Sequence, residues 1–169
     1  MIARWTGSGS GAAAVGGVAA GIEGVVAKRL DHGYLPTRHA WHKVKTRRSA
    51  EAVVGGVLGP LTAPVARVLG GLDDAGRLRV AGRTGPLPRE SRPALGALLR
   101  PADQRHPWPS VLPPARFGDA APVEYTRVKP ALVVELAVDV AVDLVRGRPV
   151  WRHPATFQRV RLDLLAEDV

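Results

Sequence analysis

The feature that most constrains the fold is the stretch 132–144, in which apolar and polar or small residues alternate. Leucine or valine stands at every second position, and from Glu135 to Asp143 the intervening positions hold glutamate, aspartate or alanine. Because successive side chains of a β-strand point to opposite faces, this pattern predicts one long strand with one solvated face. The 19 glycines and 15 prolines also favour turn-rich β structure over a helical bundle.

The other C-terminal residues divide into valine- and leucine-rich runs that are separated by turn signals. Strands are expected over 52–58, 65–72, 78–83 and 156–162. A short helix is expected over 90–100, and the proline-rich stretch 101–124 is expected to be a surface loop. Three strands, a helix, a long loop and two further strands follow the order of an OB-fold, a small Greek-key barrel. The expected fold class is therefore mainly β, with one short helix.

The charge of the chain points to a polyanionic partner. The formal net charge is +9; seven Lys or Arg stand against one acid from Lys28 to Arg48, and five arginines stand without an acid from Arg146 to Arg161. Clustered positive charge of this kind is typical of proteins that bind nucleic acid. The chain has no cysteine, which excludes disulfides and cysteine nucleophiles and fits a cytoplasmic setting. No membrane partner is expected, because no apolar stretch approaches the length of a membrane span.

Two short runs near the N-terminus combine an acid with several cations. The run 23–29 starts with Glu23 and closes on cations, and the run 41–45 contains Lys43 and Lys45. If both runs are strands, residues two apart lie on one face and are separated by about 7 Å. One carboxylate and several lysines on neighbouring strands can hold a nucleotide phosphate together with its metal.

These runs resemble motifs of the bacterial ATP-dependent DNA ligases, which are covalent nucleotidyltransferases. The run EGVVAK at 23–28 resembles motif IV, and KVK at 43–45, with Trp41 ahead of it, resembles motif V. Three further runs resemble the C-terminal OB domain of that family, namely VKPALVVEL at 128–136, WRHP at 151–154 and FQRVRLD at 157–163. The last of these is a weak match to motif VI, because no cation follows the aspartate.

The resemblance implies roles for the charged residues. Lys28, Lys43 and Lys45 would bind the AMP phosphate and Glu23 would bind a metal, so the expected cofactors are ATP and Mg²⁺. The residues expected to contact nicked duplex DNA are Arg47, Arg48, Arg152, Arg159 and Arg161.

The resemblance also implies a division of the chain. A flexible or weakly helical leader is expected at 1–20, and an OB-fold domain at 50–169. Between them, 21–49 would be a remnant of the antiparallel sheet of the nucleotidyltransferase, or adenylation, domain.

The family's nucleophile is the lysine of a Lys-x-Asp-Gly motif, and this sequence contains no such motif. The resemblance therefore implies a ligase-like function in strand joining, DNA repair and recombination, with an incomplete adenylation site. It implies that the chain does not adenylylate itself alone, and that a separate polypeptide would have to supply the nucleophile. Two alternatives stay open, a non-catalytic OB-fold module that binds nucleic acid and a degenerate ligase fragment, so the sequence does not decide whether the chain is an enzyme.

Overall fold

The computed structural model describes most of the C-terminal two thirds of the chain and three short strands nearer the N-terminus. The described residues are 4–5, 24–29, 41–45, 47–112, 122–145 and 148–169. The chain divides into two compact units, residues 1–47 and 48–169, and each is described by itself.

The described part of the first unit is a small three-stranded sheet in the order β1-β2-β3. The runs expected to be strands are confirmed as β2 (Gly24–Arg29) and β3 (Trp41–Lys45), which pair antiparallel. The expectation of a flexible or helical leader is wrong at Arg4–Trp5, because these residues form β1 and pair parallel to β2. The rest of the leader lies outside the described residues.

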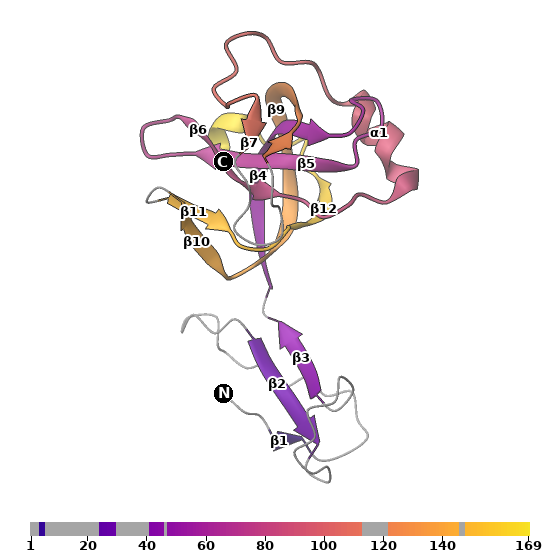
Figure 1. Cartoon of the computed structure of the whole chain (residues 1–169), viewed down its shortest axis with the longest axis vertical. Coiled ribbons are helices and arrows are strands. Elements are labelled where there is room, and N and C mark those ends of the chain that lie inside the picture. Colours follow the sequence, from indigo (N-terminus) through magenta and orange to yellow (C-terminus); the bar gives the residue numbers. More distant parts are fainter. Residues whose placement is uncertain (1–3, 6–23, 30–40, 46, 113–121, 146–147) are drawn as a thin grey trace. The chain divides into compact units, whose positions relative to one another are not determined.

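The second unit is built on a five-stranded sheet in the order β12-β9-β4-β5-β6 (Figure 1). Its strands are β4 (Arg47–Leu58), β5 (Ala66–Leu72), β6 (Leu78–Arg83), β9 (Thr126–Asp139) and β12 (Thr156–Val160). The pairs β12·β9, β4·β5 and β5·β6 are antiparallel. A parallel bridge between Thr84 and Ala155 joins the end of β6 to the start of β12. The two edge strands therefore meet, and the sheet closes into the expected Greek-key OB barrel.

The expected helix is present but shorter than the range 90–100. A 3-10 turn at Arg89–Ser91 leads into α1 (Arg92–Ala97), with Pro93 in its first turn, where no backbone N–H is needed. Gly96 is required at the packing surface, because a Cβ there would meet the backbone carbonyl oxygens of Leu61 and Thr62.

The turn between β5 and β6 is held by one aspartate. Asp73 Oδ1 accepts hydrogen bonds from the backbone N–H groups of Ala75 and Arg77, at 3.1 and 3.0 Å. The Arg79 guanidinium donates to Asp73 Oδ2 at 2.9 Å, and these donors hold the pKa of Asp73 well below its usual range. Gly76 adopts a φ of 68°, which explains the glycine at the end of this turn.

Buried residues lie on both faces of the barrel sheet. On the inner face they are Ala52, Val54, Val57, Leu69, Leu99, Val128, Val134, Leu136, Val138 and Ala155. On the outer face Val53, Val68 and Leu78 pack with Trp108. β9 is accordingly buried on both sides at its centre, since Val133 and Val134 are 1% and 0% exposed. The expectation that this strand keeps one solvated face is wrong there.

Most of the described residues of the stretch 101–124, which are 101–112 and 122–124, are exposed. The expectation that this stretch is an irregular surface loop is therefore wrong only in part. The stretch contains two short strands, β7 (Val111–Leu112) and β8 (Val123–Glu124), and it buries His106 and Trp108. Trp108 can be buried because glycines of β4 and β5 leave a flat surface for its ring. A Cβ at Gly55 or Gly70 would collide with the Trp108 ring, so their absence of side chains lets the indole lie on β4 and β5. Trp108 Nε1 also donates to the Leu78 carbonyl oxygen at 3.1 Å.

The stretch 132–144 was expected to be one strand, and it is divided. β9 ends at Asp139, and Val142–Val145 forms a separate strand, β10, that pairs antiparallel with β11 (Arg148–Trp151). β12, which pairs with β9 in the barrel, begins opposite Ala137, and Val142–Val145 pair with β11 instead. Trp151 holds this hairpin to the barrel, because its ring packs against Gly82 of β6.

The only regular helices among the described residues are short, and none of them is long and apolar enough to cross a membrane. The C-terminal residues form a 3-10 turn at Ala166–Asp168. Val169 then joins the outer cluster, and its carbonyl oxygen accepts a hydrogen bond from the Leu72 N–H at 3.0 Å.

We expect Gly70→Ala to destabilise the protein by about 1–3 kcal/mol, because the new methyl group would displace Trp108 and press on the Arg79 carbonyl oxygen. Gly71→Ala on the same strand is the matched control. Its Cβ would meet only the Val169 carbonyl oxygen, at 3.9 Å, so it should be neutral or slightly stabilising. Urea unfolding of both variants measures the difference, and equal midpoints would contradict the need for a flat surface under Trp108.

We expect stability to fall as the pH drops from 7.5 to 5.0, partly because of His106. Its pKa is lowered, first by burial and then by the nearby Arg127 charge. The unfolded chain therefore binds a proton near pH 6.5 that the folded chain accepts only at lower pH, so this stability is complete above that pH and is lost below it. Thermal unfolding across this range measures the loss.

The variant His106→Asn should flatten part of this pH dependence, because an asparagine oxygen can accept the Trp108 N–H, as His106 Nδ1 does at 3.2 Å. His153→Asn, at an exposed site, serves as the control and should keep the loss of stability at low pH that comes from His106. An unchanged pH profile in His106→Asn would show that the buried imidazole is not its source.

Candidate nucleic-acid interface

The hairpin formed by β2 and β3 brings the three lysine positions that were singled out in the sequence to one face. The register pairs Lys28 with Trp41, Lys43 with Val26 and Lys45 with Gly24. Directly paired residues of antiparallel strands lie on the same face, as do residues two apart along one strand. Lys28, Lys43 and Lys45 therefore occupy one face, whereas the sequence pattern alone had placed only the last two together.

Gly24 is the position at which the hairpin needs a glycine. It has a φ of 155°, and a Cβ there would meet the Val44 carbonyl oxygen and the Lys45 Cα. The second residue of the run EGVVAK is thus explained by the close approach of β3. The preceding Glu23, which was expected to bind a metal, lies outside the described residues.

The second unit carries a network of charges on the outer face of β4, β9 and β12, here called the outer charge cluster. Its members are Ser49, Glu51, Glu135, Arg159, Arg161 and Asp163. Arg159 Nε donates to Glu135 Oε2 at 2.7 Å, and the two residues face each other in the register of β12 and β9. Ser49 Oγ donates to the other oxygen of the same carboxylate, at 3.0 Å.

Arg161 is the hub of this cluster. Its Nη1 donates to Glu51 Oε1 at 2.8 Å, and its Nε and Nη2 donate to Asp163 at 2.9 and 2.7 Å. The Asp163 carboxylate, more than any other group, raises the pKa of Arg161, and the guanidinium lowers the pKa of Asp163 to about 2. The Arg159 and Ser49 hydrogen bonds lower the pKa of Glu135. Arg161, Asp163 and Glu135 are therefore ionised at neutral pH.

Exposure separates the two arginines of this cluster. The side chain of Arg161 is only 17% exposed, whereas that of Arg159 is 65% exposed. A side chain that is mostly covered and paired with carboxylates on three sides is suited to holding strands together. Arg159 presents most of its guanidinium to solvent and is better placed to meet a phosphate.

The other predicted arginines are exposed. Arg152 Nε pairs with Asp143 at 3.0 Å, and the neighbouring His153 Nδ1 lies 3.4 Å from Asp139 Oδ2. Arg47 and Arg48 stand at the start of β4, in the first and second unit respectively. Sequence reasoning named Arg152, Arg159 and Arg161 but missed the carboxylates that pair with them, because the pairing depends on strand register and not on sequence spacing.

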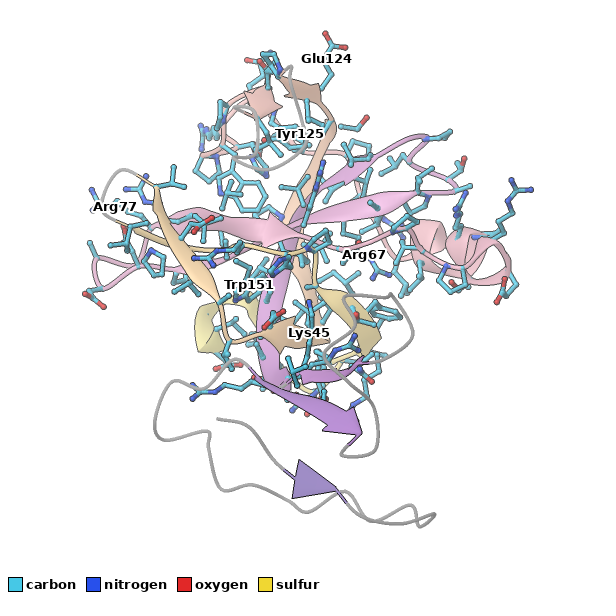
Figure 2. All side chains as sticks on the ribbon, turned by 60° about the horizontal axis from the view of Figure 1, so that its bottom comes forward. Lys45, Arg67, Arg77, Glu124, Tyr125 and Trp151 are labelled. Carbon is cyan, nitrogen blue, oxygen red and sulfur yellow. The ribbon has the colours of Figure 1, made fainter. Side chains whose placement is uncertain are left out.

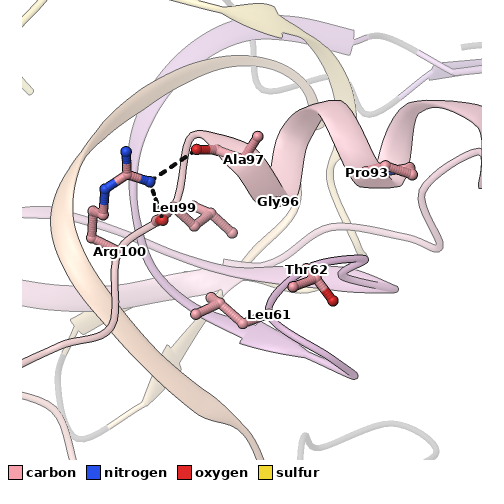
Figure 3. Close-up of a pocket in the computed structure, with 7 residues that line it drawn as sticks. All are labelled: Leu61, Thr62, Pro93, Gly96, Ala97, Leu99 and Arg100. Atoms are coloured by element: carbon pink, nitrogen blue, oxygen red, sulfur yellow. Dashed lines mark hydrogen bonds between the residues drawn. The ribbon is translucent and has the colours of Figure 1, made fainter.

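A small pocket lies between α1 and the turn after β4, but it offers little chemistry (Figure 3). Its lining is largely apolar and consists of Leu61, Thr62, Pro93, Gly96, Ala97, Leu99 and Arg100. The Arg100 Nη1 donates to the carbonyl oxygens of Ala97 and Leu99, at 2.9 Å each, and so satisfies the end of the helix. No group of three histidine or carboxylate side chains that could hold a metal ion occurs among the described residues.

The second unit is a closed OB barrel, and in the sequence a lysine-bearing hairpin precedes it. Comparison with known proteins shows which family the chain resembles. No family model matches the chain. It is 34% identical to DNA ligase C1 of Mycolicibacterium smegmatis over 147 residues and 33% identical to DNA ligase C2 of that organism over 163. It is also 38% identical over 122 residues to the multifunctional non-homologous end joining DNA repair protein LigD of Mycobacterium tuberculosis.

These alignments cover a larger share of this chain than of its relatives. The alignments take in 85% of this chain for both C-type ligases and 69% for LigD, but only 42%, 45% and 16% of the relatives. The chain therefore spans less than half the length of the curated relatives that it matches.

Solved structures give the same result. The ligase domain of M. tuberculosis LigD has a TM-score of 0.54 at 31% identity, covering 87% of this chain and 47% of that one. A mycobacterial DNA ligase D complexed with ATP and MES has a TM-score of 0.51 at 29% identity, covering 85% and 45%. The chain is homologous to the C-terminal part of the ligase domains of mycobacterial DNA ligases.

We expect Arg161→Ala to lower the unfolding midpoint more than Arg159→Ala does. Loss of Arg161 leaves Glu51, Glu135 and Asp163 facing one another, whereas loss of the exposed Arg159 removes one surface pair, worth within about 1 kcal/mol. Urea unfolding at low salt measures both effects. High salt should reduce the difference between them, and a larger effect of Arg159→Ala would contradict the assignment of Arg161 as the hub.

Proposed function

We propose that the chain binds nicked duplex DNA as the C-terminal part of an ATP-dependent DNA ligase, in strand joining during DNA repair and recombination. The observation that carries this proposal is the hairpin face that holds Lys28, Lys43 and Lys45, in a chain homologous to ligase domains. Three lysine positions on one strand face suit a phosphate group, because several cations can meet one phosphate there.

The same lysines would hold the phosphate of AMP, so ATP is the proposed cofactor. A homologous mycobacterial DNA ligase D has been solved in complex with ATP. Magnesium would be bound through Glu23, and the described residues contribute no metal site of their own. When bound, the metal would neutralise phosphate charge during nucleotide transfer.

The nucleophilic lysine would come from elsewhere, because the sequence printed here contains no Lys-x-Asp-Gly. We propose that a separate polypeptide supplies it and that this chain contributes DNA binding and part of the phosphate clamp. Intracellular DNA of the cytoplasm would be the substrate. On this proposal the chain is one half of an enzyme.

The DNA-contacting residues are proposed to be Arg47, Arg48, Arg152 and Arg159, with Arg161 supporting Arg159 from behind. The four named as contacts are exposed, and exposed cations release counterions when they meet phosphates. The carboxylate partners of Arg152 and Arg159 would compete with the DNA backbone, so binding by these two residues should be weakened readily by salt.

A non-catalytic OB module for single strands is the second candidate, and the closed barrel of the second unit supports it. The aromatic side chains count against it. Modules of that type stack bases on exposed aromatic rings. In the described part of the second unit Trp108 is buried, Trp151 packs on Gly82, Phe157 lies under Arg67, and the Tyr125 hydroxyl donates to the Pro109 carbonyl oxygen.

We expect the purified chain to bind nicked duplex DNA more tightly than intact duplex or single strands, with a steep dependence on salt. Lys43→Ala/Lys45→Ala should lower the slope of log K against log salt by about two, since each lost phosphate contact removes roughly 0.9. Fluorescence anisotropy across a salt series measures both.

The matched control is Arg89→Ala/Arg105→Ala, which removes two exposed positive charges outside the proposed interface. An equal change in both double variants would show that only net charge matters. A preference for single strands would favour the non-catalytic module, and equally weak binding to all three DNAs would point to a degenerate fragment.

A further inference from the structure

Arg67, on β5, is the least expected residue in the barrel. It is fully buried, at 0% exposure, and burial lowers its pKa to about 10. None of its three guanidinium nitrogens has a hydrogen-bond partner in the described structure. Arg67 is labelled in the barrel in Figure 2. Its one close contact of note is with Phe157, whose ring centroid lies 4.2 Å from the guanidinium carbon.

A buried cation without a carboxylate is unfavourable for stability, so a barrel selected for stability alone would place an apolar residue here. A guanidinium over an aromatic face recovers part of this loss through cation–π attraction, which strengthens where water is excluded. The charge of Arg67 therefore acts mainly on the position of the Phe157 ring. The ring belongs to β12, the strand that carries Arg159 and leads into Arg161.

Arg67 also lies where the barrel closes. Its N–H donates to Thr84 Oγ1 at 3.1 Å, and the Thr84 N–H donates to its carbonyl oxygen at 2.9 Å. Thr84 in turn bridges to Ala155, two residues before Phe157. The backbone of Arg67 is thus joined through Thr84 to the start of β12, and its side chain contacts the same strand two residues further along.

Immediately after Phe157, β12 contains a bulge. Phe157 pairs with Leu136 and Arg159 pairs with Glu135, so two residues of β12 advance while β9 advances by one. In a regular strand Phe157 and Arg159 would share a face, and Arg159 would point into the barrel. The bulge at Gln158 reverses this alternation and turns Arg159 outward to Glu135, a re-aiming that bulges near functional sites commonly provide.

We propose that Arg67 is a positioning residue for Arg159: its stack on Phe157 fixes the bulge in β12 and so keeps Arg159 on the outer face. Phe157 is held inward by the guanidinium on one side and by the inner cluster around it. When Phe157 is fixed opposite Leu136, Arg159 can lie opposite Glu135 only because Gln158 is an extra residue in β12. The effect on DNA binding rests on the proposed function, but the effect on strand register does not.

The first test is hydrogen exchange of β12 in the full chain. Arg67→Met keeps an unbranched, though shorter, side chain, removes the unpaired charge and should still fold cooperatively. We expect several-fold faster exchange at Arg159 and at Arg161, whose N–H donates to the Val133 carbonyl oxygen, with β4 unchanged. Unchanged protection across β12 would overturn the proposal.

Two variants of the ring keep the test decisive if Arg67→Met fails to fold. Phe157→Leu removes the aromatic face and should accelerate exchange in the same segment, while Phe157→Tyr keeps the face and should preserve wild-type protection. If leucine and tyrosine behave alike, the cation–π contact does not fix the bulge and the proposal is wrong.

The second test measures DNA binding and separates the two proposals. Arg159→Ala should lower the salt slope by about one, Arg67→Met should lower it by a similar amount, and the double variant should lower it no further. Additive losses would overturn the positioning role. If the wild-type chain shows no salt-dependent DNA binding, the proposed function fails, and the exchange measurement still decides the role of Arg67.

Discussion

Closure of the barrel between Thr84 and Ala155 is the constraint on which the rest of the second unit depends. Without this bridge β6 and β12 would be two free edges of an open sheet, each with unpaired backbone groups. The hydrogen bonds on either side, from the Gly85 N–H to Ala155 and from the Ala155 N–H to Arg83, are 3.0 and 2.9 Å long. They fix where β12 starts, and thus which of its side chains face outward.

The charged residues of the barrel act mainly on one another. Glu135 accepts from Arg159 and Ser49, while Arg161 connects β4 and β12 through Glu51 and Asp163. The 24 lysines and arginines of the chain are therefore not all available to a ligand, and the net charge of +9 counts only their excess over the 15 acids. What distinguishes the arginines is exposure, and it assigns opposite roles to two residues that stand two apart in the sequence.

Much of the architecture was predictable from the sequence because it follows from local periodicity and turn chemistry. Valine-rich runs, the Asp73–Gly76 turn and a short helix gave the order of an OB-fold, and the two lysine-bearing runs are strands as expected. The division of 132–144 was not predictable, because alternation continues through Asp139 while the pairing partner changes.

The burial of the stretch around Trp108 was missed for a different reason. Proline-rich sequence indicates a surface path, and nothing within it signals that Gly55 and Gly70 provide a floor for the indole. These glycines are distant in sequence and only the register of β4 and β5 brings them together. The carboxylate partners of the arginines were missed for the same reason. The sequence also did not show that Lys28 shares a face with Lys43 and Lys45, because this depends on the hairpin register.

The paired arginines and the hairpin lysines suggest different contributions to DNA binding. An arginine that must leave a carboxylate gains only the difference between two ion pairs when it meets a phosphate, so on the proposed function Arg152 and Arg159 would add selectivity for geometry more than affinity. The hairpin register places three lysine positions on one face, opposite Gly24, Val26 and Trp41. On the proposed function these positions would meet a phosphate group, while the barrel arginines would respond to how the phosphate backbone is placed.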